Sequence, residues 1–167
     1  EAAQLRHLPE GLTLDQAAGL TVNPPTAWRM LEDFVSLAPG DWIAQNAANS
    51  AVGRCVIQIA RQRGWKTVNL VRRPEVVAEL KALGAEAVLV EEGEVSRRVR
   101  EITGSSPVRL ALNAVGGESA QNLARILSPG GTLRFRHSAS TELSQLSDPL
   151  ASAHDLGLSL GLAVMDE

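Results

Sequence analysis

Short apolar runs alternate with stretches of helical periodicity from Asp41 onward, and this alternation constrains the fold more than any other feature of the sequence. Strand–helix–strand units repeated in this way form a parallel sheet covered by helices. Runs with the length and composition of strands lie at residues 42–45, 67–71, 87–90, 109–113, 132–135 and 156–164. Helical stretches lie at residues 52–63, 74–83, 94–102 and 118–127. Right-handed crossovers then predict an α/β fold, a doubly wound, six-stranded parallel Rossmann sheet in the order 3-2-1-4-5-6 with helices on both faces.

The segment before this alternation has a different pattern. Residues 11–37 have the periodicity of two helices, of which Pro24 and Pro25 open the second, and Ala-Pro-Gly at 38–40 follows them. A chain of 167 residues is long enough for one sizeable core. We therefore expect a helical lead-in segment over residues 1–37 and a Rossmann domain over residues 38–167.

Composition argues against several classes of function. The net charge of −3 provides no positive field for nucleic acid. No stretch approaches the roughly 20 apolar residues of a membrane span, and residues 1–10 lack the pattern of a signal peptide. The single cysteine suits a reducing compartment, so we expect the cytoplasm, with the mitochondrial matrix as the alternative. The histidines lie far apart without cysteines or paired carboxylates at ligand spacing, and we expect no metal site.

The turn after the first strand carries the strongest site pattern. Small residues over 46–53 connect a strand to a helix, and such a turn lets backbone N–H groups meet a pyrophosphate at the positive end of the helix. Gly53 holds the last position of the G-x-G-x-x-G frame, but the first two glycines are absent. Close packing without a ligand would also explain the small residues. The candidate cofactor-binding residues here are Asn46, Asn49, Ser50, Ala51, Val52 and Gly53.

Two arginines directly follow the second strand. In NAD-selective Rossmann folds an acidic residue near this place binds the ribose hydroxyls, whereas an arginine suits a 2′-phosphate. Arg72 and Arg73 stand here without a nearby acid, which favours NADPH as the cofactor. A solvated surface pair is the alternative explanation for two adjacent arginines.

The fourth strand ends in Asn-Ala-Val-Gly-Gly at residues 113–117. Ligands of open α/β sheets bind at the carboxyl ends of the strands. Asn113 and Val115 are therefore further candidates for cofactor binding. A plain strand-to-helix turn explains the two glycines equally well.

Four segments together resemble a known family. They are VNPPTAWRML at 22–31, PGD at 39–41, QNAANSAVG at 45–53 and LALNAVGG at 110–117. These segments resemble the trans-2-enoyl-CoA reductases, a branch of the medium-chain dehydrogenase/reductase superfamily close to the quinone oxidoreductases. Asn46 and Asn49 with Ser50 replace the commoner alanine and glycine residues of the superfamily, and this replacement is typical of the enoyl reductase branch.

The resemblance implies an NADPH-dependent oxidoreductase of fatty-acid biosynthesis that reduces the C2=C3 double bond of a 2-enoyl-CoA or enoyl-acyl-carrier-protein substrate. It implies that Asn23 lies near the nicotinamide end of the cofactor. Arg136, Leu162 and Val164 fall where the family contacts the nicotinamide portion, although Arg-His-Ser at 136–138 replaces the usual Tyr-Gly-Gly-like turn. The family also implies a homodimer formed through the edge strand.

The catalytic half of such an enzyme is not in this sequence. The proton-donating tyrosine of the family belongs to an amino-terminal GroES-like barrel, and this chain contains no tyrosine. We therefore assign no catalytic residue, expect the lead-in segment to join such a barrel, and expect the chain to bind the cofactor without efficient turnover by itself. A quinone or alkenal reductase of the same superfamily and a non-catalytic NADPH-binding module are the alternatives.

Overall fold

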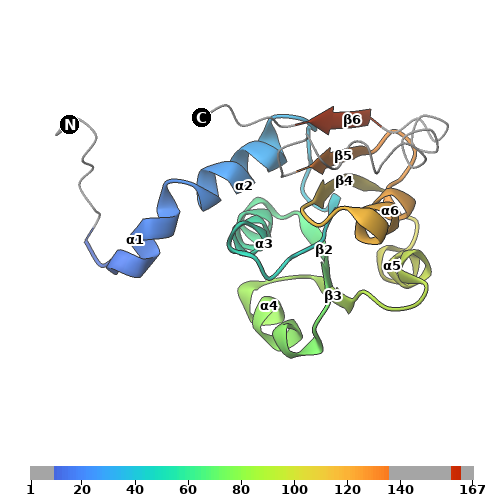
Figure 1. The fold of residues 1–167 in the computed structure, drawn as a ribbon. Coiled ribbons are helices and arrows are strands. Elements are labelled where there is room, and N and C mark those ends of the chain that lie inside the picture. The colour runs from blue at the N-terminus through green and yellow to red at the C-terminus, as the bar shows by residue number, and fades with distance from the viewer. Residues whose placement is uncertain (1–9, 136–158, 163–167) are drawn as a thin grey trace.

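A single parallel sheet forms the centre of the molecule (Figure 1). The computed structural model describes residues 10–135, except for the side chains of residues 15 and 16, and the backbone of residues 159–162. The sheet has the order β3-β2-β1-β4-β5-β6. Its strands are β1 (Trp42–Gln45), β2 (Lys66–Val71), β3 (Ala87–Val90), β4 (Val108–Asn113), β5 (Thr132–Phe135) and β6 (Ser159–Leu162). The α/β fold with a parallel sheet is confirmed, and the strand order reverses between β1 and β4, where such sheets bind ligands.

Helices lie on both faces of the sheet (Figure 1). They are α1 (Leu14–Leu20), α2 (Asn23–Glu32), α3 (Ala51–Arg63), α4 (Val77–Leu83), α5 (Val95–Thr103) and α6 (Gly117–Ile126). In Figure 1, α3 and α4 lie on one side of the sheet, and α5 and α6 lie on the other. A 3-10 turn, η2 (Pro74–Val76), precedes α4, so the predicted helix at 74–83 begins with a tighter turn, as helices often do.

The central strand β1 is buried on both faces. Successive side chains of a strand point to opposite sides. Ile43 packs with Leu31 of α2 and Val56 of α3, whereas Ala44 packs with Leu123 of α6. Because both faces are covered, a ligand reaches this strand only at its carboxyl end.

Buried amides fix the neighbouring strands relative to one another. Gln45 Nε2 donates to Asn69 Oδ1 at 2.7 Å and to the Gly53 carbonyl oxygen at 3.0 Å. Asn69 Nδ2 donates to Thr67 Oγ1 and to the Ala87 carbonyl oxygen, each at 2.9 Å. A buried polar group without a partner costs about 1–3 kcal/mol, so these bonds favour one arrangement of β1, β2, β3 and the start of α3.

The predicted helices and strands are present, and most of their boundaries agree closely with expectation. The two lead-in helices are present, and the second has prolines in its first turn as predicted. Gly64 and Gly84 end α3 and α4 in the left-handed conformation, which glycine adopts without a steric penalty. The strand predicted at 156–164 is β6, whose described part covers only 159–162.

Candidate functional site

The turn between β1 and α3 places a helix N-terminus at the carboxyl edge of the sheet. Ser50 is the N-cap of α3, and its Oγ accepts a hydrogen bond from the Gly53 N–H at 3.2 Å. The N–H groups of Ala51 and Val52 also lie in the first turn, where no carbonyl of the helix reaches them. Donors at the positive end of a 13-residue helix are therefore in place for an anion such as phosphate.

Two backbone positions shape this turn. Ala47 has a φ of 45°, in the left-handed region that favours glycine. A Cβ atom on Gly53 would lie 2.6 Å from the carbonyl oxygen of Ala48 and 2.9 Å from that of Ala47. Gly53 thus allows close packing of helix on turn, which is the role of the last glycine in the dinucleotide fingerprint.

Asn46 and Asn113 join the ends of β1 and β4 where the strand order reverses, and both are buried. Asn46 Nδ2 donates to Asn113 Oδ1 at 2.7 Å, and Asn46 Oδ1 accepts from the Ala114 N–H at 2.7 Å. Asn113 Oδ1 also accepts from the N–H groups of Val115 and Gly116, at 3.2 and 3.1 Å. The two amides hold both turns in place. Asn113 Nδ2 is left as a buried donor without a partner in the described part of the chain.

A second set of hydrogen bonds leads from Asn46 to the end of β3. Asn46 Nδ2 also donates to Ser119 Oγ at 2.9 Å, and Ser119 Oγ donates to Glu91 Oε2 at 2.9 Å. Asn122 Nδ2 donates to the other carboxylate oxygen, Glu91 Oε1, at 3.1 Å. Two residues of α6 therefore hold the Glu91 carboxylate directly after β3.

A cavity of about 360 Å³ opens at this edge, and we call it the sheet-edge cavity. Residues after four different strands contribute to its lining, which consists of Ala47, Asn49, Leu70, Arg72, Arg73, Val76, Glu91 and Val115. The side chains of Arg72 and Arg73 are exposed, and among the described residues neither forms an ion pair or a hydrogen bond. Both guanidinium groups are therefore open to an anionic ligand.

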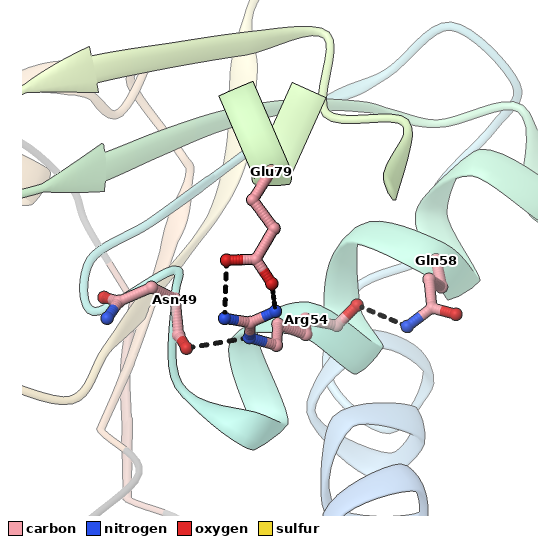
Figure 2. Close-up of polar contacts among 4 residues, drawn as sticks. All are labelled: Asn49, Arg54, Gln58 and Glu79. Carbon is pink, nitrogen blue, oxygen red and sulfur yellow. Dashed lines mark hydrogen bonds and ion pairs between the residues drawn. The ribbon is translucent and has the colours of Figure 1, made fainter. Parts of the chain in front are cut away.

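Arg54 of α3 ties the turn to α4 (Figure 2). Its Nε donates to the Asn49 carbonyl oxygen at 3.0 Å. Its Nη1 and Nη2 pair with the two carboxylate oxygens of Glu79, and the Nη2–Oε2 distance is 3.0 Å. The hydrogen bond from Arg54 lowers the pKa of the Glu79 carboxyl, and the same bond raises the pKa of Arg54. Both groups stay charged at neutral pH, so the connection persists there.

A second cavity, of about 590 Å³, lies between α1, α2 and α3, and we call it the helical cavity. Its lining consists of Leu12, Gly19, Leu20, Asn23, Pro24, Ala51, Arg54, Cys55, Gln58 and Ile59. Burial raises the pKa of the Cys55 thiol. Ala51 is the first residue of α3, so the two cavities flank the same helix terminus.

The structure brings most of the predicted site residues together. Asn49, Arg72, Arg73 and Val115 line the sheet-edge cavity, and the residues from Ser50 to Gly53 form the start of α3 beside them. Asn23 lies instead on the wall of the helical cavity. Arg136 and Val164 lie outside the described residues, and of Leu162 only the backbone, in β6, is described.

Asn46 was expected to bind the cofactor directly, but its side-chain amide is already used within the protein. Both polar atoms of its amide are bonded to Asn113, Ser119 and the Ala114 N–H. It therefore positions the turns, and the contact with a ligand is left to its neighbours.

Two residues of the site were missed at the level of sequence. The sequence indicated no acid near Arg72 and Arg73, but the structure places Glu91 on the same cavity wall. Its position directly after the third apolar run could have revealed it, because the carboxyl ends of parallel strands share one edge. Arg54 had no such signal, since its partner Glu79 is 25 residues away on another helix.

The arrangement fits the phosphates of NADP(H). The start of α3 offers backbone donors to a pyrophosphate, and Arg72 and Arg73 offer guanidinium groups to a 2′-phosphate. The unpartnered Nδ2 of Asn113 supplies a further donor at the strand-order reversal. The part of the chain that is described contains no group of three or more His, Cys, Asp or Glu side chains that could hold a metal ion.

The fold and the sheet-edge site define a dinucleotide-binding protein of the Rossmann class. The sequence profile of a family described as zinc-binding dehydrogenase matches residues 51–142, and the chain belongs to this family. Within it, the relatives place the chain in the enoyl reductase branch of the medium-chain dehydrogenase/reductase superfamily, as the sequence indicated. Across the described residues, no helix is both long and apolar enough to cross a membrane.

Three relatives illustrate this membership. A mitochondrial enoyl-acyl-carrier-protein reductase of Caenorhabditis elegans is 52% identical over 126 residues, which are 73% of this chain and 36% of that protein. A mutant enoyl thioester reductase from Candida tropicalis is 34% identical with a TM-score of 0.79, over 93% of this chain and 45% of that one. The Etr1p complex with NADP and crotonyl-CoA is 30% identical with a TM-score of 0.76, over the same shares. The chain thus spans less than half the length of these relatives.

Proposed function

We propose that this chain forms the NADPH-binding domain of an oxidoreductase that reduces the C2=C3 double bond of 2-enoyl thioesters in fatty-acid biosynthesis. The observation that carries the proposal is the sheet-edge cavity, where Arg72 and Arg73 lie without partners among the described residues, beside the start of α3. Arginine binds phosphate through charge-assisted and often bidentate hydrogen bonds. NADPH carries a 2′-phosphate for these groups, and NADH does not.

When bound, NADPH supplies the hydride for the reduction. The N–H groups of Ala51 and Val52 would bind the pyrophosphate, and the side chains of Arg72 and Arg73 would hold the 2′-phosphate. Asn46, through its bonds to the neighbouring turn, keeps the ends of β1 and β4 at a fixed separation. Contacts at these points would restrict the position of the cofactor, and hydride transfer requires such near-attack geometry. Asn23, at the other side of the α3 terminus, faces that end in our proposal.

A second domain completes the enzyme in this proposal. The chain contains no tyrosine, so a tyrosine proton donor comes from a domain that the lead-in segment, residues 1–37, joins to the Rossmann domain. We propose enoyl-CoA or enoyl-acyl-carrier-protein as the substrate of the completed enzyme. The relative from Caenorhabditis elegans is a mitochondrial protein, which favours the mitochondrial matrix over the cytoplasm. Pairing of two copies through β6 would form a homodimer, because edge strands readily pair with a copy of themselves.

The missing tyrosine also favours a second candidate, a non-catalytic NADPH-binding module. An assay with crotonyl-CoA and NADPH separates the two. The chain fused to a catalytic barrel of the same branch oxidises NADPH if the first proposal is correct. Binding of NADPH by the fusion without oxidation of the cofactor would favour the module.

The cofactor preference is tested with the chain itself. We expect NADPH to bind more tightly than NADH, measured by quenching of tryptophan fluorescence. Replacement of both Arg72 and Arg73 by alanine should remove about tenfold or more of the affinity for NADPH, since each hydrogen bond to a charged group contributes about 1.5–3 kcal/mol. The affinity for NADH should change little.

The matched control is replacement of Arg97 and Arg100 by alanine. Both are exposed residues of α5, outside the lining of the sheet-edge cavity, and their loss changes the net charge by the same amount. This variant should keep the preference for NADPH. Equal affinities of the unmodified chain for the two cofactors would refute the assignment of the 2′-phosphate.

A further inference from the structure

We infer that Glu91 selects the base of the cofactor by accepting a hydrogen bond from the 6-amino group of adenine. This inference rests on the proposed function, because it concerns the adenosine end of the same dinucleotide. Glu91 lines the sheet-edge cavity together with the two arginines. Nothing in the phosphate chemistry of the site requires a carboxylate there.

The sheet register places Glu91 beside Arg72. Val71 of β2 pairs with Val90 of β3, and the Glu91 N–H donates to the Val71 carbonyl oxygen at 2.8 Å. The next residues of the two strands therefore stand at the same level of the edge, with backbones roughly 4.8 Å apart. Even so, no ion pair joins Arg72 to Glu91 in the described structure. Each of the two charged groups is therefore available to bind a different part of one ligand.

The Glu91 carboxylate is held in one orientation. Ser119 Oγ donates to one of its oxygens at 2.9 Å and Asn122 Nδ2 donates to the other at 3.1 Å. A carboxylate has about four lone-pair positions, so acceptor capacity remains after these two bonds. Because both donors belong to α6, the carboxylate cannot turn toward Arg72 without losing them.

The rest of the lining suits a flat, largely apolar ring. Leu70, Val76 and Val115 contribute apolar surface, and the positive charges lie after β2 on Arg72 and Arg73. An ionised carboxylate accepts hydrogen bonds and repels phosphate, so it directs the 2′-phosphate to the arginines. Acids that bind ribose hydroxyls follow the second strand in Rossmann folds, where this chain has Arg72. The group left for Glu91 is a donor on the base, and adenine offers its 6-amino group.

The experiment compares NADPH with nicotinamide hypoxanthine dinucleotide phosphate, in which a carbonyl oxygen replaces that amino group. Fluorescence titration of the whole chain should give about tenfold weaker binding of the hypoxanthine cofactor, since the half-buried Glu91 carboxylate then faces an acceptor. In Glu91→Ala the ratio of the two dissociation constants should fall to near one. In Glu91→Gln it should also fall, because the amide can donate to the carbonyl oxygen.

Glu92→Ala is the control, because Glu92 is exposed, adjacent, and absent from the cavity lining, and it should keep the preference for adenine. The ratio is measured within each variant, so partial loss of folded protein cancels from it. NADPH binding by the unmodified chain with no preference between the bases would overturn the role of Glu91 alone, as would an unchanged ratio in Glu91→Ala. Failure to bind NADPH at all would overturn the proposed function and this inference with it.

Discussion

The two cavities beside the start of α3 are built in different ways. Residues at the ends of four adjacent strands line the sheet-edge cavity, and hydrogen bonds among Asn46, Asn113, Ser119 and Glu91 connect the ends of β1, β4 and β3. The helical cavity is larger, and most of its lining residues belong to helices α1, α2 and α3. Its wall includes α1, whose Leu14 is 79% exposed.

The two cavities therefore depend on different parts of the fold. A parallel sheet aligns the ends of its strands through backbone hydrogen bonds, so the sheet fixes where the residues of the sheet-edge cavity begin. The helical cavity depends on α1 and α2, and Leu20 and Trp28 on these helices are also exposed. The comparison predicts that changes at the sheet edge affect the cofactor most strongly.

The largest effect is expected from Gly53→Ala. The new Cβ would lie 2.6 Å from the Ala48 carbonyl oxygen and force α3 away from the turn. Overpacking of this kind costs about 1–3 kcal/mol of folding free energy. Thermal unfolding should therefore occur at a lower temperature, and titration should show roughly tenfold weaker binding of NADPH because the donors of Ala51 and Val52 are displaced.

Gly19→Ala is the matched control in the helical cavity. Its Cβ would lie 3.0 Å from Asn23 Nδ2, the end of a side chain that can move, and alanine in a helix gains about 0.5–1 kcal/mol over glycine. Stability should be equal or higher, and the loss of NADPH affinity should be smaller than in Gly53→Ala, because only the Asn23 side chain at the nicotinamide end has to move. Equal losses in the two variants would contradict the distinction between the cavities.

A smaller effect is expected from loss of the hydrogen bond between Arg54 and Asn49, which links the two cavities. Arg54 lies on the wall of the helical cavity and holds the carbonyl oxygen of Asn49 in the sheet-edge cavity. Arg54→Ala should weaken NADPH binding several-fold, and Glu79→Gln less, because Arg54 then keeps its bond to Asn49. Isothermal titration of both variants measures the difference, and an unchanged affinity in Arg54→Ala would show that the turn is held without it.

The same ion pair predicts a pH dependence. The pKa of Glu79 is lower in the folded chain than in the unfolded chain. Its contribution to stability is therefore complete above the ordinary carboxyl pKa of about 4.3 and is lost as the pH falls through the lowered folded value. Melting temperatures of the parent and Glu79→Gln should differ at pH 7 and converge in acid. A difference that grows on acidification would contradict the sign.

The smallest effect concerns Cys55 in the helical cavity. Burial raises the pKa of its thiol, so less thiolate is present at neutral pH than in an exposed cysteine. Alkylation by iodoacetamide, followed by mass spectrometry, should be slower in the folded chain than in the chain in urea. Adenosine 2′,5′-bisphosphate carries the 2′-phosphate without a nicotinamide, so in our proposal it occupies only the sheet-edge cavity and should leave this rate unchanged. Protection of Cys55 by that ligand would show that the two cavities are coupled.

The sequence predicted the strands and the turns that follow them better than the side-chain hydrogen bonds between those turns. The apolar runs predicted strands that match β1, β3 and β5 at both ends, because the strands of a parallel sheet are short and largely apolar. The turn after β1 and the arginines after β2 were found for the same reason, since they stand next to such strands. The role of Asn46 was not predictable, because its partners Asn113 and Ser119 are 67 and 73 residues away. Side-chain bonds over such separations are set by tertiary packing.

The buried amides of Gln45 and Asn69 have a consequence for how the chain reaches this structure. A slip of one residue between β1 and β2 would place the two amides on opposite faces of the sheet and break the hydrogen bond between them. Each unpaired amide would then cost about 1–3 kcal/mol, so misaligned intermediates are disfavoured long before a cofactor is present. The two side chains therefore favour the native register of β1 and β2 during folding. Strands β1 and β2 with only aliphatic side chains would discriminate less between the native register and a shifted one.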